Sequence, residues 1–257
     1  MRISTFAPSA RLASVVEKLS IVETPYEVSR ALLPDLAPIV GVRFAGAASE
    51  IADARITRLP DASLAGVRGT VRHMRTHANS GVVLAHFRPG CAPAVFGVPM
   101  HELFGATVAL DALLGRAAAA RLVERVTGAA DHHARVAILD AALVERIGAF
   151  TPDSLVSAAV TAITRARGSL RIADVADQLD ISQDPLEKRF RSTVGTSPKH
   201  FASLVRITHA IELAKHGGRL ARIAHAAGYF DQSHFNRDFR AVTGTSPTTF
   251  FNAAAFC

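Results

Sequence analysis

The feature that most constrains the fold of this chain is an internal repeat near its C-terminal end. Residues 171–201 (RIADVADQLDISQDPLEKRFRSTVGTSPKHF) align with residues 219–250 (RLARIAHAAGYFDQSHFNRDFRAVTGTSPTTF). Arg171 matches Arg219 at an offset of 48 residues, and Phe201 matches Phe250 at an offset of 49. The copies therefore differ by one residue in the middle, where an insertion lengthens a turn without disturbing the flanking helices. Such a repeat predicts one supersecondary unit that occurs twice.

Each copy has the pattern of a helix, a tight turn and a second helix. In the second copy Leu220, Ile223 and Ala224 recur at helical spacing and predict one apolar face. Gly228 is placed to end that helix, because glycine adopts the left-handed conformation without a steric penalty. Asp231 is placed to cap the next helix, since its carboxylate can accept hydrogen bonds from free backbone N–H groups.

The helix that follows Asp231 is expected to be amphipathic. Phe235, Phe239 and Val242 face inward at helical spacing. The outward face carries amide, hydroxyl and guanidinium groups: Gln232, Ser233, Asn236, Arg237 and Arg240. Two short helices with a glycine turn, the second carrying such groups outward, are typical of a DNA-reading helix-turn-helix. The repeat therefore predicts two DNA-reading units.

A long helix over about residues 198–216 is expected to join the two units. Phe201, Leu204 and Ile211 contribute its apolar stripe, and Gly217 follows its end. Roughly 18 residues at 1.5 Å each span about 27 Å. With tilt and packing, this length suits two reading helices that enter successive major grooves about 34 Å apart.

The best domain boundary lies at residues 150–152. Thr151 is expected to cap a new helix, with Pro152 at the first helical position, where its missing N–H costs nothing. The sequence thus predicts two domains: an N-terminal α+β domain over residues 1–150 and an all-α domain over residues 151–257.

Within the N-terminal domain, residues 8–24 place apolar side chains at helical spacing and predict a short amphipathic helix: Leu12, Val15, Val16 and Leu19. From about residue 26 to 90, short apolar runs between prolines and glycines predict a small antiparallel sheet. After Cys91 the pattern becomes helical and includes a helix over residues 131–148. The apolar stripe of that helix suits packing within the domain or a homodimer contact. We interpret the domain as a sensor or dimerisation domain.

Charge and composition bound the partners. The formal net charge is +7, which favours a polyanion without distinguishing DNA from RNA or anionic lipid. The two cysteines, Cys91 and Cys257, make no disulfide framework. No apolar run approaches the ~20 residues that a membrane helix needs. We therefore expect a cytoplasmic protein without a membrane partner.

The motifs IADVADQLDIS…LEKRFRSTVGTSPKHF and IAHAAGYFDQSHFNRDFRAVTGTSP resemble the DNA-binding domain of AraC/XylS-type transcription regulators. The resemblance covers roughly residues 155–253, and the N-terminal part is more weakly similar to a domain found in a subset of these regulators. It implies a transcription regulator that binds double-stranded DNA and RNA polymerase. The base-reading positions that it implies lie on the second helix of each unit: Asp184, Pro185, Glu187 and Lys188, then Gln232, Ser233, Asn236 and Arg237.

Two departures from the family pattern concern the first unit. Asp180 stands in the turn where the family usually has glycine, and aspartate tolerates the left-handed region better than most residues. The first reading helix begins with Asp184, Pro185 and Glu187, and carboxylates repel phosphates and accept only from cytosine among the common base contacts. We therefore expect the first unit to hold mainly the DNA backbone and the second to read bases. The residues expected to hold phosphates are Arg191, Lys199 and Arg240.

Other functions stay open at this stage. For Arg237 a guanine contact is favoured, and the alternative is a solvated helix charge that pairs with Asp231 or Asp238. An enzyme domain over residues 1–150, directed to DNA by the C-terminal part, would need a nucleophile–base pair, and no such motif occurs, so no catalytic residue or cofactor is expected. A protein-interaction module is the third class, and a small-molecule effector of the N-terminal domain is invisible in the sequence. The residues considered for a metal site, which is not favoured, are His73, His77, His86, Cys91 and His101. Cys91 is expected to be a small buried residue rather than a redox sensor, which would need a stabilised thiolate.

Overall fold

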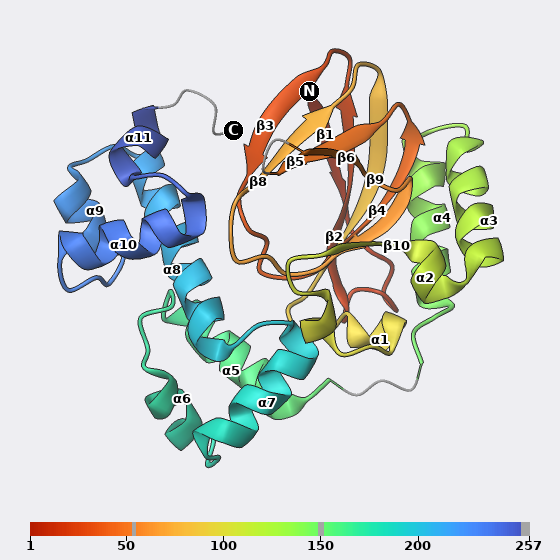
Figure 1. The fold of residues 1–257 in the computed structure, drawn as a ribbon. Helices are drawn as coiled ribbons and strands as arrows, with labels where there is room; N and C mark the ends of the chain where they lie inside the picture. The colour runs from red at the N-terminus through yellow and green to blue at the C-terminus, as the bar shows by residue number, and fades with distance from the viewer. Residues whose placement is uncertain (53–54, 149–151, 253–257) are drawn as a thin grey trace.

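The computed structural model of the chain describes residues 1–52, 55–148 and 152–252 (Figure 1). A β-rich N-terminal part is followed by an all-helical C-terminal part, which confirms the predicted fold class. None of the helices in the described part of the chain combines the length and the apolar character needed to cross a bilayer.

Two antiparallel sheets face each other in the N-terminal part. The first has the strand order β1-β2-β9-β4-β7-β10: Arg2–Phe6, Val16–Thr24, Ser80–Phe87, Ile39–Ala45, Ala62–Ala65 and Thr107–Ala109. The second has the order β3-β8-β5-β6: Val28–Leu32, Arg72–Thr76, Ala48–Ala52 and Arg55–Arg58. The predicted antiparallel pairing is confirmed, but the strands begin at Arg2 rather than near residue 26.

The predicted helix over residues 8–24 is wrong. Residues Val16–Thr24 form strand β2, which pairs with β1 and β9. A bulge between Val16 and Lys18 adds one residue to the strand, and Val16 and Leu19 are both fully buried although three positions separate them. That spacing imitates the i, i+3 pattern of a helix. Pairing with the neighbouring strands decides between a helix and a strand, and the local sequence pattern contains no information on that pairing.

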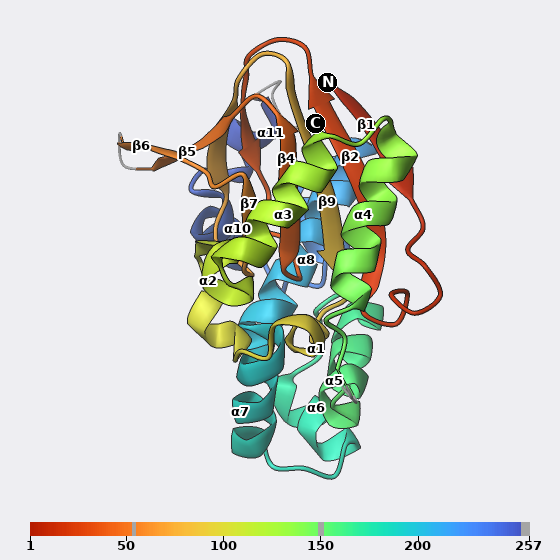
Figure 2. The ribbon, with the colours of Figure 1, turned by 90° about the vertical axis from the view of Figure 1, so that its right-hand side faces the viewer.

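Helices α3 (Arg116–Thr127) and α4 (His132–Val144) cover the outer face of the first sheet (Figure 2). Leu139 and Leu143 of α4 share one apolar cluster with Leu19 of β2. The apolar stripe of α4 is therefore used inside the domain. The remaining short helical segments of this part are α1 (Pro93–Phe96), the 3-10 helix η1 (Met100–Leu103) and α2 (Leu110–Leu114).

Two compact helical units make up the C-terminal part (Figure 1). The first contains α5 (Ser154–Arg165), α6 (Ile172–Gln178) and α7 (Gln183–Val194). The second contains α9 (Leu220–Ala226), α10 (Gln232–Thr243) and α11 (Pro247–Asn252). The joining helix α8 (Pro198–Lys215) has 18 residues and lends its first half to one core and its second half to the other. The duplicated helix-turn-helix and its rigid connection are confirmed.

The turns of the two units use different residues for the same left-handed conformation. Gly228 has φ +82° in the second unit, and Asp180 has φ +51° in the first. Asp231 caps α10, because its Oδ1 accepts from the His234 backbone N–H at 2.7 Å. Both turns therefore form as the sequence predicts, although an L-residue carries some strain in the first.

The first helix of the C-terminal part begins two residues later than predicted. Helix α5 starts at Ser154 and not at Pro152, and Asp153 caps it, with its Oδ1 accepting from the backbone N–H groups of Leu155 and Val156. The cap expected at Thr151 lies outside the described residues.

The segment between β7 and β8 packs against the second helix-turn-helix unit. Val67 is 1% exposed and belongs to the apolar cluster formed by α8, α9 and α10. The Val71 backbone N–H donates to the Val242 carbonyl of α10 at 2.9 Å. Nearby, the ring of Phe104 meets His200 of α8 edge to face at 5.8 Å. The two parts of the chain are therefore joined by packing and a hydrogen bond as well as by the backbone.

Candidate functional site

Helix α10 is held rigidly and presents a polar face to solvent. Phe235 and Phe239 are fully buried, and their rings contact each other at 5.4 Å. The residues of the outward face are all exposed: Gln232, Ser233, Asn236, Arg237 and Arg240. Because the aromatic side fixes the helix, the opposite donors are held in a defined order along it.

The two acids near Arg237 are engaged elsewhere. Asp231 caps α10, and Asp238 lies 3.4 Å from His234 Nε2. Within the described residues, no hydrogen bond or ion pair involves the Arg237 guanidinium. The ion-pair alternative for Arg237 is therefore wrong, and its five N–H donors face solvent.

Helix α7 of the first unit offers fewer free donors. Arg191 pairs with Glu187 at 3.4 Å along the same helix, and Arg189 donates to Asp153 at 2.7 Å. Lys188 is exposed, and Asp184 lies in the first turn. Arg191, which is expected to hold phosphate, is thus partly neutralised by Glu187, which is expected to read bases. This pairing favours the smaller role that the sequence predicts for the first unit.

Further exposed groups border this surface. Lys199 is exposed in the first turn of α8. Phe230, in the turn before α10, is 96% exposed, and the sequence reasoning missed it. An aromatic residue next to Tyr229, which is buried, looks like core in a linear pattern. Only the folded turn shows that the two rings point in different directions.

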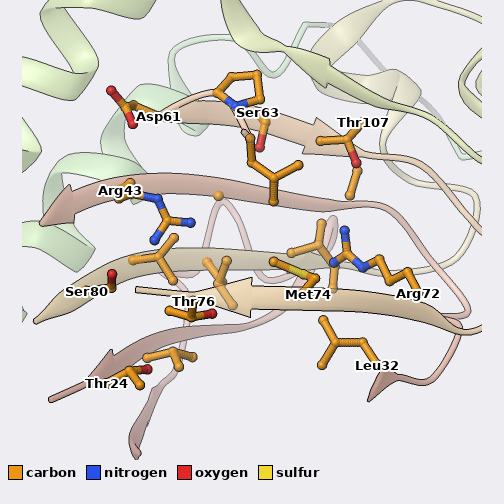
Figure 3. Close-up of a pocket in the computed structure, with 18 of the residues that line it drawn as sticks. Thr24, Leu32, Arg43, Asp61, Ser63, Arg72, Met74, Thr76, Ser80 and Thr107 are labelled. Carbon is orange, nitrogen blue, oxygen red and sulfur yellow. The ribbon is translucent and has the colours of Figure 1, made fainter. Parts of the chain in front are cut away.

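A cavity of about 100 Å³ lies between the two sheets of the N-terminal part (Figure 3). Its wall includes apolar side chains and hydroxyl groups from both sheets: Val22, Leu32, Ile39, Met74, Val82, Leu84, Thr24, Ser63, Thr76, Ser80 and Thr107. Arg30, Arg43 and Arg72 also line it, with Asp61 as the one carboxylate among the described lining residues. In Figure 3, Arg43 and Arg72 lie at opposite ends and Met74 lies between them.

None of these three arginines was identified from the sequence. The signal available is alternation: Arg30 and Leu32 share one face of β3, and Arg72 and Met74 share one face of β8. Such a pattern is equally typical of a sheet that faces solvent. These side chains line a pocket only because the strands pair into two sheets and the two sheets face each other.

Comparison with known proteins bears on both parts. A family model described as a helix-turn-helix domain matches residues 175–253. A putative AraC-like transcription regulator of Streptomyces lividans is 37% identical over 98 residues, which cover 37% of this chain and 32% of that protein. The lactose operon transcription activator of Staphylococcus xylosus is 32% identical over 71 residues, covering 27% of this chain and 25% of that protein.

The C-terminal part of the chain is similar to AraC-like helix-turn-helix regulators. It spans about a third of the length of the curated AraC-like relatives it matches, since the coverage is 32% for two of them. A model described as a domain of unknown function (DUF6597) matches residues 4–109 and assigns no role to the N-terminal sheets.

Solved structures also align with the chain. ToxT from Vibrio cholerae is 15% identical, with a TM-score of 0.47 and 98% of both chains covered. The C-terminal domain of AraT from Geobacillus stearothermophilus is 24% identical, with a TM-score of 0.39, covering 41% of this chain and 89% of that one.

Within the described residues, the histidines and Cys91 are not gathered into a set of metal ligands. Among the described residues, no three His, Cys, Asp or Glu side chains are placed to hold a metal ion. His86 bonds to Ser20 Oγ at 3.0 Å, and His77 lies 3.5 Å from Glu27. Cys91 is 7% exposed, and burial raises the pKa of its thiol while Arg88 lowers it less. The expectation of a small buried residue is therefore confirmed, since a raised pKa disfavours the reactive thiolate.

Proposed function

We propose that this protein is a sequence-specific DNA-binding transcription regulator in which helix α10 reads bases. The observation that carries the proposal is the row of exposed, unpaired donors on α10, within a duplicated helix-turn-helix of an AraC-like chain. A helix that presents amide and guanidinium groups outward suits the donor and acceptor pattern of the major groove.

The roles proposed within the interface follow from charge and pairing. On α10, Gln232, Ser233, Asn236 and Arg237 read bases, and Arg240 holds phosphate. The first unit contributes less base readout, through Lys188, Asp184 and Glu187, and holds phosphates through Arg191 and Lys199. We expect most of the sequence discrimination to lie in the half of the binding site that α10 occupies.

The test begins with selection of bound sequences from random duplex DNA by the purified chain. Arg237→Ala should then weaken binding to the selected site by about 1–3 kcal/mol, which is the range for one bidentate guanine contact. Fluorescence anisotropy with labelled duplex measures the change. Arg121→Ala removes the same charge from an exposed position of α3 and serves as the matched control.

If both variants bind the selected duplex as tightly as the parent chain, α10 does not read bases. If no duplex is enriched at all, the result favours the alternative in which the helical repeat binds another protein.

We propose that residues 1–150 control residues 151–257 through a small-molecule effector. Arg72 lines the cavity, and its neighbour Val71 donates to the Val242 carbonyl of α10. A ligand that shifts the start of β8 would therefore act on the reading helix through two successive residues. Contact with RNA polymerase, assembly into a homodimer and a cytoplasmic location belong to this proposal as consequences of acting at a promoter.

We propose no catalytic role for the cavity. Its described lining holds hydroxyl groups, arginines and one carboxylate, that of Asp61, which lies 3.6 Å from Arg58, but no histidine, cysteine or lysine. The lining favours binding over reaction.

A further inference from the structure

We propose that the cavity between the two sheets binds a small organic acid, with the Arg43 guanidinium as the counter-ion of its carboxylate. This inference names the class of effector for the control proposed above. Only the effect of the bound ligand on DNA binding rests on that proposed function. The binding itself is independent of DNA and is tested without it.

Arg43 is the residue that requires an anion. It lies on β4 and is 9% exposed, and its Nε is buried without a hydrogen-bond partner. Within the described residues, no hydrogen bond or ion pair satisfies its guanidinium, and Figure 3 shows the group directed into the cavity. An arginine stays charged in a protein, and a buried charge without a partner is costly. A bound carboxylate would remove that cost with paired, charge-assisted hydrogen bonds.

The nearest acid does not fill this role. Asp61 accepts the Arg43 backbone N–H through its own main-chain carbonyl at 2.6 Å, so the two residues are neighbours. Its carboxylate, however, lies 3.6 Å from Arg58 at a position where the side chain is 48% exposed. Burial lowers the pKa of Arg43, with Asp61 opposing that effect and Arg58 adding to it. Asp61 therefore only partly compensates the charge.

A second positive region lies at the other end of the cavity. In the β3–β8 register Arg30 is opposite Met74 and Leu32 is opposite Arg72, so the two arginines are diagonal neighbours on one face. Arg30 Nη1 donates to Met1 Sδ at 2.7 Å, and a thioether is a weak acceptor. Burial and Arg68 lower the pKa of Arg72, against the pull of Asp35 and Glu50.

Glu50 is already committed to another arginine. Both of its carboxylate oxygens accept from Arg68, at 2.6 and 2.9 Å, and Arg68 also donates to Thr107. The cavity lining therefore carries three arginines against one carboxylate among its described residues. This excess excludes a cationic ligand and favours an anionic one.

The size and the remaining wall narrow the ligand class. The volume of about 100 Å³ is somewhat smaller than an engineered cavity of about 150 Å³ that holds benzene. Apolar side chains lie between the charged ends, and hydroxyls of both sheets offer further hydrogen bonds. A short aliphatic carboxylate satisfies the charge, the apolar wall and the volume together, whereas inorganic phosphate would leave the apolar wall without contacts.

The experiment uses the full chain and isothermal titration calorimetry without DNA. The probes are butyrate and glutarate, each paired with its neutral amide, and inorganic phosphate. We expect at least one carboxylate to bind with 1:1 stoichiometry, and its amide and phosphate to bind at least tenfold more weakly. We expect Arg43→Met to lower the affinity for that carboxylate ten- to a hundredfold, which is the range for the loss of a hydrogen bond to a charged group. Arg121→Met removes the same charge from an exposed position of α3 that does not line the cavity, and it should stay within twofold.

The comparison of acid with amide needs no variant, so it decides the matter even if Arg43→Met does not fold. Amides or phosphate that bind as tightly as the carboxylates, an absence of binding by all of them, or full affinity in Arg43→Met would overturn the inference. Duplex DNA binding is measured on the same preparation. A chain that binds DNA but no carboxylate refutes this inference alone, and a chain that binds a carboxylate but no DNA refutes the proposed function alone.

Discussion

Replacing Arg43 by methionine should make the ligand-free protein more stable. Arg43 is 9% exposed and its guanidinium has no partner among the described residues, while methionine has a similar length and no charge. Exchange of buried ionic groups for apolar side chains of similar volume stabilises proteins by about 1–4 kcal/mol in favourable cases. The substitution also removes atoms from the cavity wall, which offsets part of the gain, so we expect the lower half of that range, about 1–2 kcal/mol.

That gain corresponds to a rise in the melting temperature of about 2–8 °C for a chain of this size. Differential scanning calorimetry of the ligand-free chain measures it. The control Arg121→Met, at an exposed position of α3, is expected within about 0.5 kcal/mol of the parent, as for a surface substitution. A fall in the melting temperature of Arg43→Met would refute the reasoning. It would mean that the guanidinium stabilises the fold itself, and the cavity would then lose its strongest reason to hold an anion.

Three further predictions concern the packing, pH dependence and turns of the fold. Val67→Asp should place a carboxylate in the apolar cluster at α10, at a cost of a few kcal/mol, and should split the calorimetric unfolding of the two parts into separate transitions; a single unchanged transition would show that this contact does not join them. Burial, with a smaller effect of Lys18, lowers the pKa of His86 from 6.5 to about 4, so the unfolded chain takes up a proton below pH 6.5 that the folded chain refuses. The free energy of unfolding should therefore fall by up to about 3 kcal/mol between pH 6.5 and 4, and His86→Gln should remove this part of the fall in urea titrations. Asp180→Gly should raise the free energy of unfolding by about 0.5–1 kcal/mol, because φ +51° strains an L-residue; equal or lower stability in urea unfolding would show that Asp180 is not strained there.

Much of the C-terminal part could be predicted from the sequence because its signals are local. Helical spacing, the positive φ of Gly228 and Asp180, and the cap at Asp231 each depend on residues within one or two turns of one another. The outward face of α10 follows directly, since Phe235 and Phe239 fix which side is buried. Both copies of the repeat carry these helix and turn signals, so each copy independently supports the helix-turn-helix interpretation.

The N-terminal part depended on contacts that a local pattern does not contain. The apolar spacing at Val16 and Leu19 is compatible with a helix, and the bulge against β9 makes it a strand. Likewise, nothing near Arg43 in the sequence marks it as buried, because the cavity forms only when β4 of one sheet faces β8 of the other. The contact of Val71 with Val242 joins residues far apart in the chain.

The sequence by itself thus determined the duplicated helix-turn-helix and the residues of its reading face, because helices and turns are encoded by neighbours along the chain. Only the tertiary structure decided which arginines line a cavity, which acids are already paired, and how the segment before β8 reaches α10. The physical reason is that burial and charge compensation depend on groups brought together across sheets, and such groups are not neighbours in the sequence.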